Sequence, residues 1–195
     1  FSAGHDVDAN AGEGKATREG PFRVLVLCTG NSARSQMAEA IIATRGLKRP
    51  LGRVDAFSAG SKPATKMNEY ALVTLASHGI GWGRDAPKHL DVFAGQTFDL
   101  VITVCDHARD ACPFFPGAAA QVHWGLPDPA EHIAPATARA AFSATYAALV
   151  ERVNGLLRLP LETMDAAELK QAAQGIHDKV LAPVQRSSAR LRRPT

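Results

Sequence analysis

The apolar positions of this chain form short continuous runs that alternate with segments of helical periodicity. Residues 22–28 (FRVLVLC) are almost all apolar, which is typical of a strand that is buried on both faces of a parallel sheet. Three further runs, 53–60, 98–105 and 120–124, are interpreted as strands in the same way. Because strands are expected to alternate with helices, the pattern predicts a parallel α/β sheet with right-handed crossovers.

Four helices are expected between and after these strands. The first two are predicted to end at Gly46 and Gly79, which we interpret as C-caps. The third is indicated by apolar residues that recur every three or four positions, and the fourth by an acidic capping box, DAAE, that precedes another periodic stretch. These segments are 32–46, 68–79, 138–156 and 165–176.

The predicted fold class is a single three-layer α/β domain, with a four-stranded parallel sheet, helices on both faces and an extra C-terminal helix. A chain of 195 residues with 46% hydrophobic and 21% charged residues suits one globular domain with appendages. We expect a flexible leader at 1–20, the domain at 21–160, a helical extension at 161–182 and a basic disordered tail at 183–195. No apolar run approaches the ~20 residues that cross a bilayer, so no membrane contact is expected.

Charge and cysteine usage narrow the class of partner and the compartment. The net charge of +3 is more than accounted for by four arginines within the last ten residues, so a nucleic-acid-binding face is not indicated. The three cysteines, Cys28, Cys105 and Cys112, are an odd number, which favours free thiols in a reducing compartment. We therefore expect a cytoplasmic protein that acts as a monomer, with no cofactor and no metal.

Residues of chemical interest follow the predicted strands directly. Cys28, Gly60, Cys105 and Trp124 stand at or just beyond the carboxyl ends of the four strands. Ligands of parallel α/β sheets bind at this edge. The sequence therefore predicts that four separate segments contribute to one site.

The segment 28–35 (CTGNSARS) has the features of an anion-binding loop. The following helix points its free N–H groups and the positive end of its dipole at the loop, and the Gly-Asn pair suits a left-handed turn. Arg34 can donate two hydrogen bonds to a tetrahedral anion. The same field and a hydrogen bond from Ser35 are expected to lower the pKa of Cys28 from about 8.5. The predicted anion-binding residues are Thr29, Gly30, Asn31, Ser32, Ala33, Arg34 and Ser35.

Two other interpretations of this loop are less favourable. A buried structural cysteine would leave the arginine, the serine and the Gly-Asn pair without a purpose. A nucleotide-binding P-loop requires Gly-Lys-Ser/Thr at its end, and here the residues are Ala33, Arg34 and Ser35. The anion loop with a nucleophilic thiol remains the best interpretation.

The motif VLVLCTGNSARSQMAEA resembles the low-molecular-weight tyrosine phosphatase superfamily, whose signature is Cys-x5-Arg-Ser. Three further motifs resemble the arsenate reductases of that fold: SAG (58–60), TVCDHARDACP (103–113) and HWGLPDPA (123–130). The resemblance covers about residues 22–158.

This resemblance implies reduction of arsenate to arsenite by three thiols, with phosphate as a competing oxyanion. Cys28 attacks arsenate while Asp128 protonates the departing oxygen, Cys105 attacks Cys28, and Cys112 attacks Cys105. The resulting 105–112 disulfide is reduced from outside, with thioredoxin as the expected donor. If the segment between the two cysteines is helical, seven residues rise about 10.5 Å, whereas disulfide Cα atoms lie about 4.4–6.8 Å apart. The segment would therefore have to rearrange during turnover.

Several alternatives stay open. A phosphatase would use Cys28, Arg34 and Asp128 in the same roles, although Ala130 stands where those enzymes place an aromatic residue. A non-catalytic oxyanion sensor would need neither Asp128 nor a thiol pair. The thiol pair itself could be two inert buried cysteines, or zinc ligands together with a histidine, although seven-residue spacing is not a zinc pattern. The remaining open points concern individual residues. Asn31 and Glu39 match part of the potassium site of some relatives, but residues 83–90 do not match the rest of that site. Ala33 stands where some relatives have a further cysteine, and we interpret His123 and Trp124 as packing residues.

Overall fold

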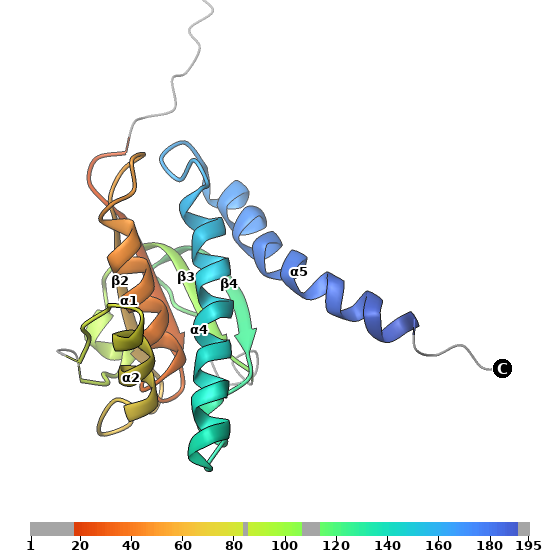
Figure 1. Ribbon diagram of the computed structural model, residues 1–195. Helices are drawn as coiled ribbons and strands as arrows, with labels where there is room; N and C mark the ends of the chain where they lie inside the picture. Colours follow the sequence, from red (N-terminus) through yellow and green to blue (C-terminus); the bar gives the residue numbers. More distant parts are fainter. Residues whose placement is uncertain (1–17, 84–85, 107–113, 191–195) are drawn as a thin grey trace, which may run out of the picture.

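Four parallel strands form a single sheet in the order β2-β1-β3-β4 (Figure 1). The computed structural model describes residues 18–83, 86–106 and 114–190. All four predicted strands are confirmed. The second begins one residue later than predicted, and the fourth is two residues longer at each end. Their bounds are β1 Phe22–Cys28, β2 Val54–Gly60, β3 Phe98–Cys105 and β4 Ala118–Leu126.

The helices follow the predicted alternation, and two short 3-10 helices precede β3 and follow β4. In the described part of the chain, no helix is long and apolar enough to cross a membrane. The helices are α1 Arg34–Gly46, α2 Glu69–Ser77, α4 Pro135–Leu157 and α5 Ala166–Arg190, and the 3-10 helices are η1 Leu90–Phe93 and η2 Pro129–Glu131.

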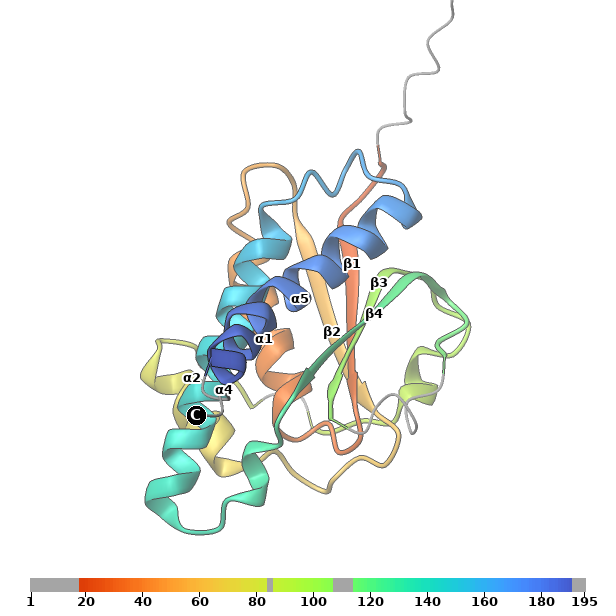
Figure 2. The ribbon, with the colours of Figure 1, turned by 90° about the vertical axis from the view of Figure 1, so that its right-hand side faces the viewer.

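The sheet is buried on both faces, as the continuous apolar run of β1 predicts. Val24 and Val26 contribute to a large core beneath α1, α4 and α5, whereas Leu25 and Leu27 face the opposite side. Figure 2 shows these helices on one side of the sheet and η1 on the other. On the η1 side, aromatic rings meet edge to face with centroids 5.6–5.8 Å apart. The predicted three-layer α/β class is confirmed.

The two glycines predicted to cap helices differ in their roles. Gly79 does adopt a positive φ of 78° just beyond α2. Gly46 instead lies inside α1, and the C-cap is Leu47 in ordinary helical geometry. A Cβ atom at Gly46 would lie 2.6 Å from the Val54 carbonyl oxygen. The C-cap prediction for Gly46 is therefore wrong, because the residue is there to let α1 approach β2.

The ends of the chain depart from the predicted boundaries. Arg18, assigned to the leader, donates to the Asp99 carboxylate and lies over the ring of Phe22, so ordered contacts begin before residue 21. The predicted capping box of α5 is confirmed, since Asp165 accepts from the Glu168 N–H at 2.8 Å and Glu168 accepts from the Asp165 N–H at 3.0 Å. The helix then continues to Arg190 rather than ending near 182. Residues 1–17 of the predicted leader and residues 191–195 lie outside the described part of the chain.

The connections of β1 create the place where a ligand can bind. β1 pairs with β2 on one side and with β3 on the other, so the crossovers from β1 leave in opposite directions. The loop that follows β1 therefore opens at a topological switch point, the usual ligand site of open parallel sheets. This places the carboxyl end of β1 between the ends of its two neighbours.

Candidate functional site

The loop between β1 and α1 is fixed from behind by the side chain of Asn31. This residue has a φ of 49°, in the left-handed region, and is completely buried. Its Oδ1 atom accepts from the Lys88 N–H at 3.0 Å, and its Nδ2 atom donates to Ser35 Oγ at 2.9 Å and Ser58 Oγ at 2.8 Å. The left-handed turn was predicted for Gly30 as well, but only Asn31 has a positive φ. One amide thus joins the loop to α1, β2 and the segment before η1.

The segment that follows β2 forms hydrogen bonds with the carbonyl groups of the loop between β1 and α1, and these bonds turn the carbonyl groups away from the centre of the loop. Backbone N–H groups within 61–68 donate to the carbonyl oxygens of residues 28, 29, 30 and 32 at 2.9–3.2 Å. Because these oxygens are engaged outside the loop, its N–H groups can face inward and receive an anion. The glycine of the SAG motif makes this approach feasible, since a Cβ atom at Gly60 would overlap the Thr29 carbonyl oxygen and lie 3.1 Å from the Asn31 nitrogen.

The thiol of Cys28 lies inside this loop with two hydrogen-bond partners. Its Sγ atom is 2.8 Å from Ser35 Oγ and accepts from the Asn31 N–H at 3.2 Å. Only 5% of the residue is exposed, and this burial raises the pKa of the Cys28 thiol above its ordinary value, although the hydrogen bonds from Ser35 and Asn31 oppose the shift. The predicted lowering of this pKa is therefore wrong, because the cost of desolvating a thiolate exceeds the effect of the hydrogen bonds.

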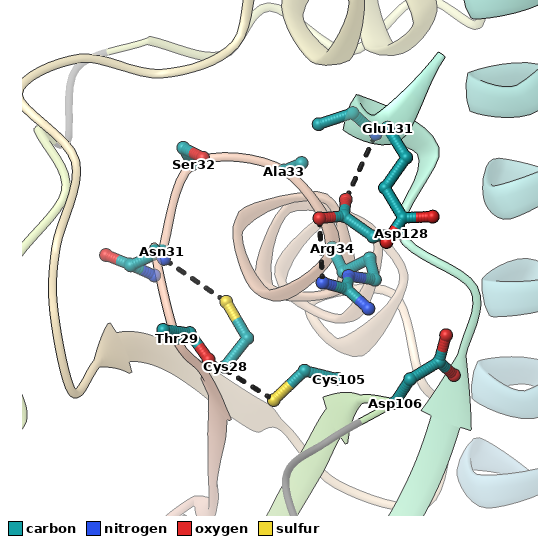
Figure 3. Close-up of a pocket in the computed structure, with 12 residues that line it drawn as sticks. Cys28, Thr29, Asn31, Ser32, Ala33, Arg34, Cys105, Asp106, Asp128 and Glu131 are labelled. Carbon is teal, nitrogen blue, oxygen red and sulfur yellow. Dashed lines mark hydrogen bonds and ion pairs between the residues drawn. The ribbon is translucent and has the colours of Figure 1, made fainter. Parts of the chain in front are cut away.

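Arg34 and Asp128 lie together on the opposite side of the loop (Figure 3). Arg34 Nη1 donates to the Leu126 carbonyl at 2.8 Å, and its Nη2 atom lies 3.4 Å from Asp128 Oδ2. Asp128 also accepts from the Ala130 N–H at 3.0 Å and so caps η2. Asp128 thus caps a short helix and also faces Arg34 at the edge of the sheet where a ligand is expected.

The second predicted thiol, Cys105, reaches the same place from β3. Thr29 Oγ1 is 3.9 Å from Cys105 Sγ, and Cys105 is 3% exposed. Figure 3 shows the sulfur atoms of Cys28 and Cys105 at the base of one cavity. The third predicted thiol, Cys112, lies outside the described residues, as does His107, one of the two histidines that the zinc alternative could use.

The cavity has a volume of about 280 Å³ and gathers the predicted residues of the β1 loop, β3 and the Asp-Pro turn. Ser35 is the exception, because it lies fully buried behind the loop. The sequence reasoning missed Asp106 and Glu131 as wall residues, although their positions beside Cys105 and Asp128 were a usable signal. The lining residues are Cys28, Thr29, Gly30, Asn31, Ser32, Ala33, Arg34, Cys105, Asp106, Asp128, Ala130 and Glu131.

Behind the cavity, the hydrogen bonds continue into the interior. Ser58 Oγ donates to the Glu39 carboxylate, so the buried Glu39 is joined to Asn31 through one hydroxyl group. Within the described residues, no group of three or more His, Cys, Asp and Glu side chains is arranged to hold a metal ion. His123 bonds to Thr103, and Trp124 is buried with its indole N–H bonded to Ala173, as the packing interpretation expects.

A cysteine and an arginine on a loop between strand and helix, with an aspartate facing them, define a class of phosphatase-like anion sites. Residues 23–174 match the family described as low molecular weight phosphotyrosine protein phosphatase, and the chain belongs to this family. The predicted family is thereby confirmed.

Within that family, several proteins similar to this chain are arsenate reductases. The chain is 40% identical over 108 residues to an arsenate reductase of Halalkalibacterium halodurans, a match that covers 55% of this chain and 74% of that protein. It is 39% identical over 108 residues to one of Brevibacillus brevis, with coverage of 55% and 76%. The crystal structure of an arsenate reductase from Archaeoglobus fulgidus superposes with a TM-score of 0.55 at 29% identity, covering 69% of this chain and 98% of that one.

Proposed function

We propose that this protein reduces arsenate to arsenite, with its own thiols as the immediate electron source. The observation that carries the proposal is the position of a second cysteine, Cys105, beside Cys28 at the base of an anion-sized cavity. A phosphatase needs one sulfur nucleophile, whereas reduction by two electrons needs a second thiol that can form a disulfide. The similarity to arsenate reductases supports the same assignment.

The first half of the reaction forms a covalent adduct. The Cys28 sulfur attacks As(V), an As–S bond forms, and one oxygen leaves as water with a proton from Asp128. Because burial raises the pKa of the thiol, the thiolate must be stabilised when the anion binds; the incoming dianion is a suitable acceptor for the thiol proton. Arg34 and the loop N–H groups would hold the remaining oxygens.

The second half transfers the electrons. The Cys105 sulfur attacks the Cys28 sulfur, the S–S bond forms and the As–S bond breaks. The electron pair of that bond stays on arsenic, which leaves as As(III) in arsenite. Cys112 then attacks the Cys105 sulfur and releases Cys28 as a thiolate. An external dithiol reduces the 105–112 disulfide, and we propose thioredoxin for this role, with the protein acting as a monomer in the cytoplasm.

Hydrolysis of a phosphoester is the second candidate, because Cys28, Arg34 and Asp128 form the set that such a reaction needs. The wall beside Asp128 offers Ala130 and Glu131 rather than an aromatic ring on which an aryl ester could stack. This difference favours a small inorganic oxyanion over phosphotyrosine.

The deciding experiment measures arsenate-dependent NADPH oxidation in the presence of thioredoxin and its reductase, beside release of p-nitrophenol from p-nitrophenyl phosphate. The wild type is compared with the Cys105→Ser and Cys28→Ser variants. We expect both variants to lose arsenate reduction, whereas only Cys28→Ser should abolish any phosphoester hydrolysis. Multiple turnovers of arsenate by Cys105→Ser would contradict the proposal, and phosphoester hydrolysis without arsenate reduction by the wild type would favour the second candidate.

A further inference from the structure

The outer edge of β4 is paired with a side chain instead of another strand. β4 is the edge strand of the sheet, and α5 lies alongside it (Figures 1 and 2). The Gln174 amide of α5 accepts from the His123 N–H at 3.0 Å and donates to the His123 carbonyl at 3.0 Å. A single carboxamide thus makes both bonds that a peptide group of a neighbouring strand would make.

The same residue of β4 is also tied to β3. His123 Nδ1 lies 2.7 Å from Thr103 Oγ1, and these two residues are partners in the sheet. Immediately beyond them the register changes, because the next β3 partner pair is Cys105 with Leu126. β4 therefore uses three residues where β3 uses two. His123 is the last residue before this irregularity and is held on both sides.

The irregularity depends on a close packing of glycine against the His123 ring. A Cβ atom at Gly125 would lie 2.7 Å from His123 Nε2. The extra residue brings the Leu126 carbonyl to Arg34 Nη1, at 2.8 Å, and Asp128 follows two residues later. Gln174 is therefore connected to Asp128 by a short stretch of backbone, which consists of the pairing with His123, the register shift and the turn after Leu126.

We propose that Gln174 and His123 are positioning residues that set where β4 ends, and thereby fix Asp128 and the Leu126 carbonyl relative to Arg34. This role rests on the proposed function in one respect, that Asp128 donates the proton to the leaving oxygen. The Gln174 amide touches neither the cavity nor its contents, so it acts through the backbone of β4.

The helix that carries Gln174 has other anchors, which makes the role testable without loss of the fold. Trp124 Nε1 donates to the Ala173 carbonyl at 2.9 Å. The buried Arg152 on α4 donates from Nε to His177 Nδ1 at 3.0 Å. Removal of the Gln174 amide therefore leaves α5 attached to both β4 and α4.

The test compares Gln174→Met with Lys179→Met, which lies on the exposed side of the same helix. Gln174→Met keeps the length of the side chain but removes both of its hydrogen bonds to His123. A misplacement of about 1 Å can cost ~10²-fold in rate, so we expect single-turnover formation of the Cys28–arsenic adduct to slow by about 10- to 100-fold in Gln174→Met. Lys179→Met should match the wild type. Phosphate protection of Cys28 from alkylation should change by less than about threefold.

A double-mutant cycle separates positioning from general destabilisation. In the Asp128→Asn background, Gln174→Met should have almost no further effect, since the group it positions is already gone. Full additivity of the two substitutions, or an unchanged rate in Gln174→Met, would overturn the proposal.

Amide hydrogen exchange provides a readout that does not depend on the reaction. In Gln174→Met, we expect faster exchange at the amides of 123–128 and unchanged exchange in 166–173. Uniform acceleration in both segments would show a merely structural role. If the wild type fails to reduce arsenate, the proposed function fails, and this exchange pattern still decides whether Gln174 positions β4.

Discussion

The guanidinium of Arg34 lies 3.4 Å from the carboxylate of Asp128 across the mouth of the anion loop. Arg34 is buried, and its guanidinium contacts Asp128 and the Leu126 carbonyl. An oxyanion that enters the loop competes with Asp128 for this guanidinium. Binding would therefore weaken the ion pair between Arg34 and Asp128.

Replacement of Asp128 by asparagine should slow formation of the Cys28 adduct by about 10²–10⁴-fold, because the leaving oxygen loses its proton donor. Anion binding should change little, since the loop N–H groups and Arg34 remain. Rapid-quench measurement of a single turnover checks the rate, with Asp91→Asn, on an exposed side chain, as the matched control. An unchanged rate would make Asp128 a turn residue only.

The Gly60→Ala variant tests the close approach between the β2 end and the loop. A methyl group there would overlap the Thr29 carbonyl, and such overpacking costs about 1–3 kcal/mol. Since 1.4 kcal/mol corresponds to tenfold, we expect phosphate affinity, measured by calorimetry, to fall by about 10-fold or more. Gly81→Ala is the control, because a Cβ atom there meets nothing within 4 Å. Equal affinities in the two variants would refute the packing argument.

The pH dependence of Cys28 follows from its burial, which raises its pKa, and from the Ser35 hydrogen bond, which lowers it. Loss of that bond in Ser35→Ala should raise the pKa further. The midpoint of the pH–rate profile for iodoacetamide labelling, followed on the Cys28 peptide, should move upward, while Ser77→Ala leaves it in place. A midpoint that stays or falls in Ser35→Ala would show that Ser35 does not donate to the sulfur.

The raised pKa of Cys28 also makes the free energy of unfolding depend on pH. Because the native thiol holds its proton to a higher pH than the unfolded one, the unfolded chain binds fewer protons above about pH 8.5. The free energy of unfolding should therefore decrease as pH rises through this window, and Cys28→Ser should remove that part of the slope. Chemical denaturation between pH 7 and 10 checks the prediction.

The order of the thiols is tested by trapping. In Cys112→Ser we expect one arsenite release and then a Cys28–Cys105 disulfide, whereas Cys105→Ser should leave arsenic on Cys28. Mass spectrometry of non-reduced peptides identifies each species. Repeated turnover by Cys112→Ser, with thioredoxin as the only reductant, would contradict the three-thiol relay.

Sequence reasoning succeeded where one local pattern decides the outcome. The continuous apolar runs of β1 and β3 and the acidic box at Asp165 each fix an element without reference to the rest of the chain. The predictions were wrong where the outcome depends on contacts between segments that are distant in the sequence. Gly46 is needed because Val54 lies beside it, and the pKa of Cys28 depends on how deeply the folded loop is covered. The role of Gln174 was invisible, because nothing in the periodicity of a helix shows that one amide will pair with a strand.

The first nine residues of α1, from Arg34 to Ile42, are all buried between the sheet and the other helices. One wall of the cavity is thus built into the interior and can be altered only by repacking the whole molecule. The other wall, on η2, is formed by the exposed side chains of Ala130 and Glu131. Variation of substrate size within this architecture, by natural drift or by directed evolution, should therefore concentrate on η2 and leave α1 almost unchanged.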